Sequence, residues 1–259
     1  MSEIIIKAEE IFKIGSYVIT NSLLLSFAVL LFLSILAIFL RKNVKLIPGK
    51  IQNVFEMIIE FLLSIIDSVL GEEDKSSSSP FAAARVSDRK KSEKYLPLIA
   101  TIFLFVLISN WFGLLPGIGS IFVREGSSNV PLFRSPAGDL NFTLALAIVA
   151  VLSTNFLGIV VMGFFTHIKK FFNFGSPINF FVGILELMSE LSKVVSFSFR
   201  LFGNIFAGEV LLIIMTFLMP YVLPVPFLMM EIFFGAIQAF IFAMLTLVFL
   251  SVHTIKTEH

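Results

Sequence analysis

The sequence predicts an all-α polytopic membrane protein with about five membrane-crossing helices and one amphipathic interfacial helix. Hydrophobic residues make up 57% of the 259 residues, charged residues only 14%, and 32 residues are phenylalanine. The mean hydropathy is +0.98. Because a soluble globule of this size needs more charge on its surface, we interpret residues 1–259 as a single membrane domain.

The same composition excludes several classes of function. The chain has no cysteine, which removes disulfides, thiolate metal sites and cysteine nucleophiles. Its net charge of +1 gives no electrostatic support for nucleic-acid binding. The sequence also lacks glycine-rich phosphate loops, metal-ligand clusters and catalytic triads. We therefore expect no catalytic residue, cofactor or metal in this chain.

Three apolar stretches are each long enough to cross the ~30 Å of hydrocarbon in a bilayer. They cover residues 22–40, 96–115 and 141–166. Arg41 and Lys42 close the first of them. Each stretch predicts one membrane-crossing helix.

Residues 51–70 predict a helix that lies at the membrane surface. Gln52, Glu56, Glu60 and Asp67 recur at steps of four and seven, so they share one helical face, with apolar residues elsewhere. This pattern is typical of an amphipathic interfacial helix.

Charges between the predicted spans orient the protein. Segment 41–94 holds ten Lys or Arg residues and segment 117–140 holds two, so the positive-inside rule places the first in the cytoplasm and the second outside. Within the first, the polar, Ser-rich residues 71–94 predict a flexible loop. The first stretch, 22–40, does not have the pattern of a signal peptide, because the leader MSEIIIKAEE is partly acidic and no small-residue cleavage site follows. Five crossings then leave residues 1–21 outside and the C-terminus in the cytoplasm.

Two further apolar stretches follow, at residues 176–219 and 226–252, and the first is unusually long. As one helix its 44 residues would measure ~66 Å, about twice the hydrocarbon thickness. Such a helix either breaks, at Gly203 or Gly208, or lies steeply inclined to the membrane.

The long stretch also carries polar residues on two faces, although an Arg or Asp at a helix centre costs ~2.5–3.5 kcal/mol. On a wheel of ~100° per residue, Ser196, Gly203 and Asn204 fall within ~40° of Arg200. Glu209 lies nine residues beyond Arg200, which places it ~180° around the helix and ~13.5 Å along it. The two charges therefore suit separate compartments.

Other polar residues in the apolar stretches have both functional and structural interpretations. Glu231 and Gln238, seven residues apart, share a face of the last stretch. Glu186 lies near the expected cytoplasmic end, where it could snorkel or pair with a neighbour. Asn110 could bond between helices. A purely structural role explains Arg200 poorly, because more than twenty residues of predicted helix precede it and apolar sequence follows.

Residues 191–212 (LSKVVSFSFRLFGNIFAGEVLL) closely resemble the signature of subunit a of F-type ATP synthases, the stator side of the proton channel. Four other segments agree in order: SNWFGLLPG (109–117), SPAGDLNFT (135–143), ELMSELSK (186–193) and IQAFIFAMLTLVFLS (237–251). The resemblance spans roughly residues 20–253. The segment RLFGNIFAGE (200–209) resembles bacterial rather than mitochondrial members of the family.

The resemblance implies a role for each matching residue. Arg200 falls on the family's essential arginine, Asn204 on the adjacent amide and Glu209 on the channel carboxylate. Glu231 and Gln238 fall on the polar pair of the last helix, where many bacterial members carry His in place of Glu231.

The resemblance also implies an architecture and partners. The stretches 176–219 and 226–252 would form a long, steeply tilted hairpin around a ring of c subunits, with a b-subunit peripheral stalk nearby. The complex would lie in a bacterial plasma membrane, where other subunits make ATP. The rotor-facing residues would be Ser196, Arg200, Gly203 and Asn204. The outer half-channel would be lined by Glu209, Glu231, Gln238, Asn110 and Asp139, with Glu186 on the cytoplasmic side.

The rival functions are a secondary ion transporter, a stand-alone ion channel and a passive membrane scaffold. Transporters usually contain an internal repeat, and five crossings divide poorly into halves. A scaffold leaves Arg200 unexplained. Whether protons or sodium ions couple the complex stays open here, because the c subunit carries most of the ligands that decide it.

Overall fold

A computed structural model describes residues 10–14, 17–45, 47–71, 81–115, 118, 121–125, 128–164 and 177–254, and most of these are helical. Five helical segments are long and apolar enough to cross a membrane, which confirms the predicted multi-pass helical fold. The helices are α1 (Asn21–Lys42), α2 (Lys50–Gly71), α3 (Phe81–Gly113), α4 (Leu140–Met162), α6 (Pro177–Leu218) and α7 (Pro224–Thr254).

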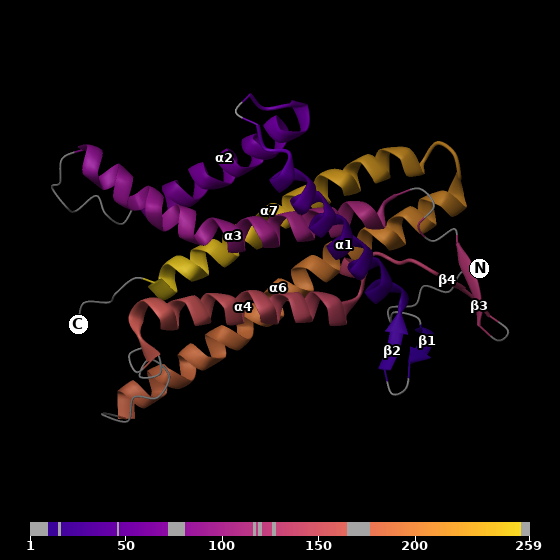
Figure 1. Cartoon of the computed structure of the whole chain (residues 1–259). Helices are drawn as coiled ribbons and strands as arrows, with labels where there is room; N and C mark the ends of the chain where they lie inside the picture. The colour runs from indigo at the N-terminus through magenta and orange to yellow at the C-terminus, as the bar shows by residue number, and fades with distance from the viewer. Residues whose placement is uncertain are drawn as a thin grey trace.

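Two short antiparallel hairpins, which the sequence analysis did not predict, accompany the helices. β1 (Glu10–Ile14) pairs with β2 (Tyr17–Thr20), and β3 (Phe122–Glu125) pairs with β4 (Ser128–Pro131). Both hairpins lie at the end of the molecule where α6 turns into α7 (Figure 1). Strands of four or five residues carry too little periodic signal to stand out beside long apolar helices.

α1 begins and ends as its sequence predicts. The Thr20 side chain accepts a hydrogen bond from the backbone N–H of Leu23, and Arg41 and Lys42 stand in the last turn, where the helix dipole favours positive charge. Its outer side chains are open, with Phe27 64% exposed, as expected of a face that lipid covers.

α2 matches the predicted interfacial helix closely in its bounds and is not among the helices apolar enough to span. Leu62 and Ile66 on its apolar face are buried, and Ile66 packs with Ile99 of α3 and Leu247 of α7. The opposite side is open, with Met57 63% exposed.

α3 begins earlier than the sequence predicted. Residues 71–94 were expected to form a flexible loop, but the chain is helical from Phe81 onwards; residues 72–80 lie outside the described part. The physical reason is that residues 81–94 are rich in Ala, Arg and Lys, which are good helix formers and extend the spanning helix toward its N-terminus.

α6 is a single unbroken helix of 42 residues, ~63 Å long, with no break at Gly203 or Gly208. Ser176, the predicted cap, lies outside the described residues. α6 and α7 form a long antiparallel hairpin that runs obliquely past α4 (Figure 1). Of the two alternatives for the long stretch, the structure therefore favours the inclined helix.

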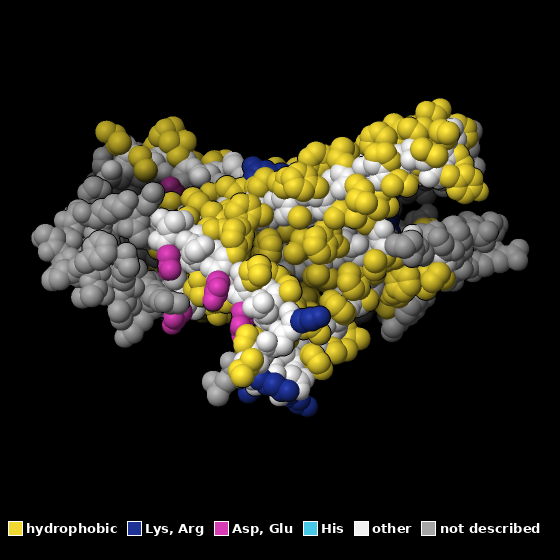
Figure 2. Space-filling view, turned by 90° about the horizontal axis from the view of Figure 1, so that it is seen from above, with side chains coloured by type: hydrophobic (Ala, Val, Ile, Leu, Met, Phe, Trp, Pro, Cys, Tyr) yellow, Lys and Arg dark blue, Asp and Glu magenta, His cyan; other side chains and the backbone are white. Residues whose placement is uncertain are grey.

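The hairpin is held by a core that α6, α7 and α4 share. Phe197 and Leu201 of α6 are buried, and the Phe197 ring lies 4.7 Å from that of Phe242 on α7. Ala147 and Ala150 of α4 join the same cluster, and their small side chains let the helices approach closely. On the face that Figure 2 shows, the described surface is largely hydrophobic, with charged side chains gathered in a few places.

Candidate functional site

Arg200 lies on the outer surface of the bundle. Its side chain is exposed, and its Nη2 donates to Ser196 Oγ one turn away at 3.4 Å. A Cβ added at Gly203 would meet no atom within 4 Å, so this side of α6 is open. Asn204 is half-buried at the edge of the same face. We call Ser196, Arg200, Gly203 and Asn204 the Arg200 face.

The packing of α6 determines where this face points. Phe197, Leu201 and Ile205 are each 2% exposed or less and form the core contacts on the other side of the helix. Because a helix has 3.6 residues per turn, burying these three side chains turns Arg200 away from the bundle.

Glu209 lies on the inner side of α6, near Arg134, one of the two positive charges counted in segment 117–140. Glu209 Oε2 is 3.6 Å from Arg134 Nη2, and the two side chains are 21% and 15% exposed. Arg134 precedes the short helix η2 (Pro136–Gly138), whose residues are buried. Its position directly before the SPAGDLNFT motif was the available signal.

Glu231 on α7 lies beside Glu209 and is almost fully buried, at 4% exposure. Its carboxylate fits against Gly208 of α6, where an added Cβ would overlap it. Neither carboxylate oxygen has a hydrogen-bond partner among the described residues. The Glu209 and Glu231 carboxylates, here called the acid pair, are close enough to repel each other.

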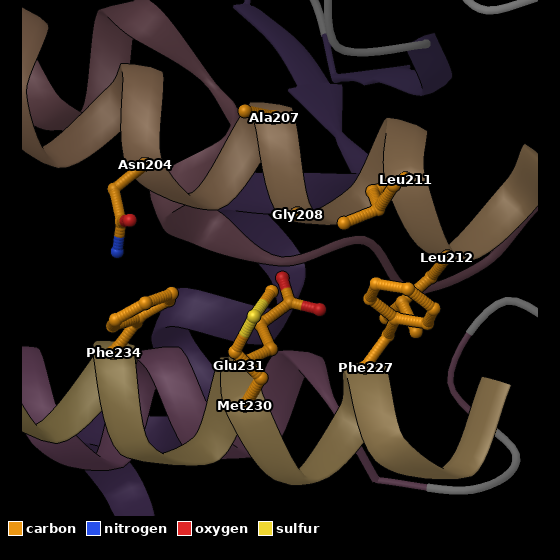
Figure 3. A pocket seen from close by; sticks show the side chains of 9 residues that line it. All are labelled: Asn204, Ala207, Gly208, Leu211, Leu212, Phe227, Met230, Glu231 and Phe234. Carbon is orange, nitrogen blue, oxygen red and sulfur yellow. The ribbon is translucent and has the colours of Figure 1, made fainter.

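A cavity of about 150 Å³ between α6 and α7 is lined by Glu231 of the acid pair and by Asn204 of the Arg200 face, and such a volume can hold several waters. Figure 3 shows the Glu231 carboxylate pointing across it toward Gly208, with Asn204 further along α6. Its lining comprises Asn204, Ala207, Gly208, Leu211, Leu212, Phe227, Met230, Glu231 and Phe234.

Two buried amide side chains lie beyond Glu231: Asn110 of α3, which contacts α7, and Gln238 of α7 itself. Asn110 of α3 donates from Nδ2 to the Gly235 carbonyl at 3.0 Å, which is the inter-helix bond considered from the sequence. Its Oδ1 has no hydrogen-bond partner among the described residues, nor does Nε2 of Gln238, which is 6% exposed.

Asp139 lies next to Gly138, but its carboxylate is occupied by hydrogen bonds within the bundle. It caps α4 by accepting from the Asn141 backbone N–H at 3.0 Å, and it accepts from Ser22 Oγ of α1 at 2.8 Å. Asp139 therefore joins the starts of two spans.

Glu186 is half-buried far from the acid pair, since its 23 residues of separation from Glu209 along α6 correspond to ~35 Å. One turn on, Glu190 accepts from Asn155 of α4 at 3.0 Å and pairs with Lys193. The structure thus gathers Glu209, Glu231 and Asn110 toward the turn of the hairpin, with Gln238 two turns further along α7, and leaves Glu186 toward the other end. No cluster of three or more Asp, Glu or His residues that could hold a metal occurs in the described ranges.

Comparison with known proteins gives a consistent picture. Residues 81–251 match the family model described as "ATP synthase A chain". The chain is 35% identical to "ATP synthase subunit a" of Helicobacter pylori (strain Shi470), over 90% of this chain and 88% of that protein. It is also 35% identical to "ATP synthase subunit a" of Campylobacter jejuni, over 86% of this chain and 85% of the relative.

The contact between Gly208 and Glu231 predicts a stability difference between two glycines of α6. Gly208→Ala adds a Cβ that overlaps the end of the Glu231 side chain, so this carboxylate must turn away within a closely packed site, which offsets the ~1 kcal/mol that the helix gains in propensity. The matched control, Gly203→Ala, adds a Cβ in open space and should raise the free energy of unfolding by ~1 kcal/mol through its higher helix propensity. Thermal unfolding of both purified variants in the same detergent measures the difference. Equal midpoints would contradict the packing described here.

Proposed function

The chain belongs to the ATP synthase subunit a family, the proton-translocating stator subunit of F-type ATP synthase, and we propose that its acid pair and Arg200 divide the proton path into two half-channels. It is a multi-pass membrane component of the ATP synthase complex. The rival function of a secondary transporter or stand-alone channel is not favoured.

The observation that carries the proposal is the placement of opposite charges on opposite sides of α6. Glu209 lies inward beside Glu231, and Arg200 lies outward on an open face. The cavity between α6 and α7, of about 150 Å³, reaches from the buried Glu231 carboxylate to Asn204, and Asn204 is one turn from Arg200.

In the proposed mechanism a proton enters from outside and binds the acid pair, with Asn110 and Gln238 as polar neighbours. Asp139 supports this side by fixing the start of α4. The proton then crosses the cavity and neutralises a carboxylate on a c subunit of the rotor ring, which can enter lipid cheaply only in its neutral form.

Arg200 keeps the two half-channels apart. A guanidinium stays protonated under all ordinary conditions, so it attracts an ionised rotor carboxylate but cannot relay protons. Its exposure on the free subunit supports a partner at this face, because an uncovered charge in hydrocarbon is costly. Each proton that crosses 100 mV supplies ~2.3 kcal/mol to rotation.

The second half-channel opens to the cytoplasm near Glu186, which helps to release the proton. In this orientation the N-terminus and both β-hairpins face outside, and the C-terminus lies in the cytoplasm. The chain itself catalyses no reaction. A b-subunit stalk anchors it within a bacterial plasma membrane, and other subunits make ATP.

Replacing Arg200 tests the barrier between the half-channels. Arg200→Ala should lower ATP-driven proton pumping by more than about tenfold, equivalent to ~1.4 kcal/mol, while the complex still assembles. A passive proton leak should appear, because nothing then separates the two paths. Arg200→Lys should also be severely impaired, since a desolvated lysine can lose its proton. Dye-quenching assays on inverted vesicles measure both, and normal coupled ATP synthesis in the lysine variant would refute the role.

Replacing Glu209 tests the outer half-channel. Glu209→Gln should lower pumping without a leak, because proton entry slows while the Arg200 barrier stays. Glu209→Asp should keep partial activity, since a titratable carboxylate remains. The same vesicles give both readouts. Normal pumping by Glu209→Leu across neutral pH would show that this carboxylate has no transport role.

Disulfide crosslinking tests which face of α6 meets the rotor. Cysteines at Ser196 or Asn204 should crosslink to cysteines placed near the c-subunit carboxylate, because both lie on the Arg200 face. A cysteine at Ile205 should crosslink poorly, because that side chain is 2% exposed within the core. The chain has no native cysteine, so the background is clean. Equal crosslinking at all three positions would exclude a fixed rotor-facing side of this helix.

A further inference from the structure

Arg134 occupies a place that the proton path itself does not explain. The acid pair brings two carboxylates together inside the bundle, and Asn110, whose Nδ2 bonds Gly235 one turn beyond Glu231, has no partner for its Oδ1 among the described residues. Carboxylate and amide oxygens are the ligands that hard metal cations prefer. An outer half-channel built in this way would attract sodium ions as well as protons.

The counter-charge at this place is supplied by the protein. Arg134 Nη2 lies 3.6 Å from Glu209 Oε2, and both side chains are largely buried. The backbone beside Arg134 is held firmly, because Ser135 and all of η2 are buried and Asp139 is tied to Ser22. Gly138 lets η2 approach closely, since an added Cβ would lie 2.7 Å from the Glu209 carboxylate.

Resting on the function proposed above, we propose that Arg134 is a specificity-determining residue: its tethered guanidinium excludes metal cations from the acid pair and leaves the outer half-channel to protons. A sodium ion needs several oxygen ligands at once and must displace the guanidinium from Glu209 against like-charge repulsion. A proton needs one oxygen lone pair and no coordination shell. The same fixed charge therefore blocks one cation and admits the other.

The proposal predicts that removing the guanidinium makes proton transport sensitive to sodium. Inverted vesicles carrying the whole complex are compared in sodium chloride and choline chloride at equal ionic strength, ~0.1 M, so that screening is the same. Wild-type pumping should be equal in both salts. Arg134→Gln pumping should be lower in sodium, about twofold lower where the sodium concentration equals its Kd at the acid pair. Raising the proton concentration should relieve the inhibition, because the two cations compete.

Two matched variants separate charge from structure. Arg134→Lys keeps a tethered cation, because the adjacent Glu209 carboxylate favours the protonated amine, and it should restore equal pumping in both salts, which a merely structural role for Arg134 would not predict. Arg124→Gln removes a positive charge from β3 in the same loop and should behave as wild type. ATP hydrolysis by the detached soluble sector, measured in both salts, controls for effects outside the membrane.

If Arg134→Gln pumps in neither salt, the Glu209→Asp variant decides, because its shorter side chain withdraws the carboxylate from the guanidinium. Its pumping should become sodium-sensitive. Equal pumping in both salts by whichever variant is active would overturn the proposal for Arg134. That outcome differs from failure of the proposed function, which would appear as normal pumping by Glu209→Gln or Glu209→Leu.

Discussion

The structure depends on the cost of holding charge within a hydrocarbon layer. An ionised group there must lie against a partner, face a polar cavity or be covered by another subunit. α6 meets this requirement in two ways on one helix. Its inner side gives Glu209 an arginine from the adjacent loop, and its outer side presents Arg200 where a partner can cover it. The apolar side chains between these faces fix the rotation of the helix.

Backbone packing makes the inner arrangement possible. Glycines stand where carboxylates meet a neighbouring element: Gly208 beside Glu231 and Gly138 beside Glu209. The segment after β4 is buried among the helices and brings Arg134 and Asp139 to the same end of the hairpin. Asp139 joins α1 to α4 there. The same loop therefore links two spans and places the Arg134 guanidinium beside the acid pair.

The length of α6 gives the two ends of the hairpin different environments. An unbroken helix of 42 residues places Glu186 and Glu209 far apart on a single rigid element. At the end near Glu186, Glu190 bonds Asn155 of α4 and pairs with Lys193, whose Nζ lies 4.7 Å from the centre of the Phe249 ring on α7. Polar contacts thus link α6 to its neighbours at both ends, and the apolar core lies between them.

The sequence by itself determined the class of the fold, the five apolar helices long enough to span a membrane, the existence of a helix at residues 51–70 and the family. Each follows from local composition, from periodicity or from a contiguous motif around Arg200, and none requires knowing which helices touch. The same periodicity placed Arg200 and Glu209 on opposite sides of one helix, because helical geometry is fixed over nine residues.

Only the tertiary structure decided what lies next to these residues. The contact of Arg134 with Glu209 joins positions 75 residues apart, and that of Gly208 with Glu231 joins two helices through a turn. It also decided that the long stretch does not break at its glycines and that Asp139 caps α4. These outcomes depend on packing between distant segments, whose energies no single stretch of sequence contains.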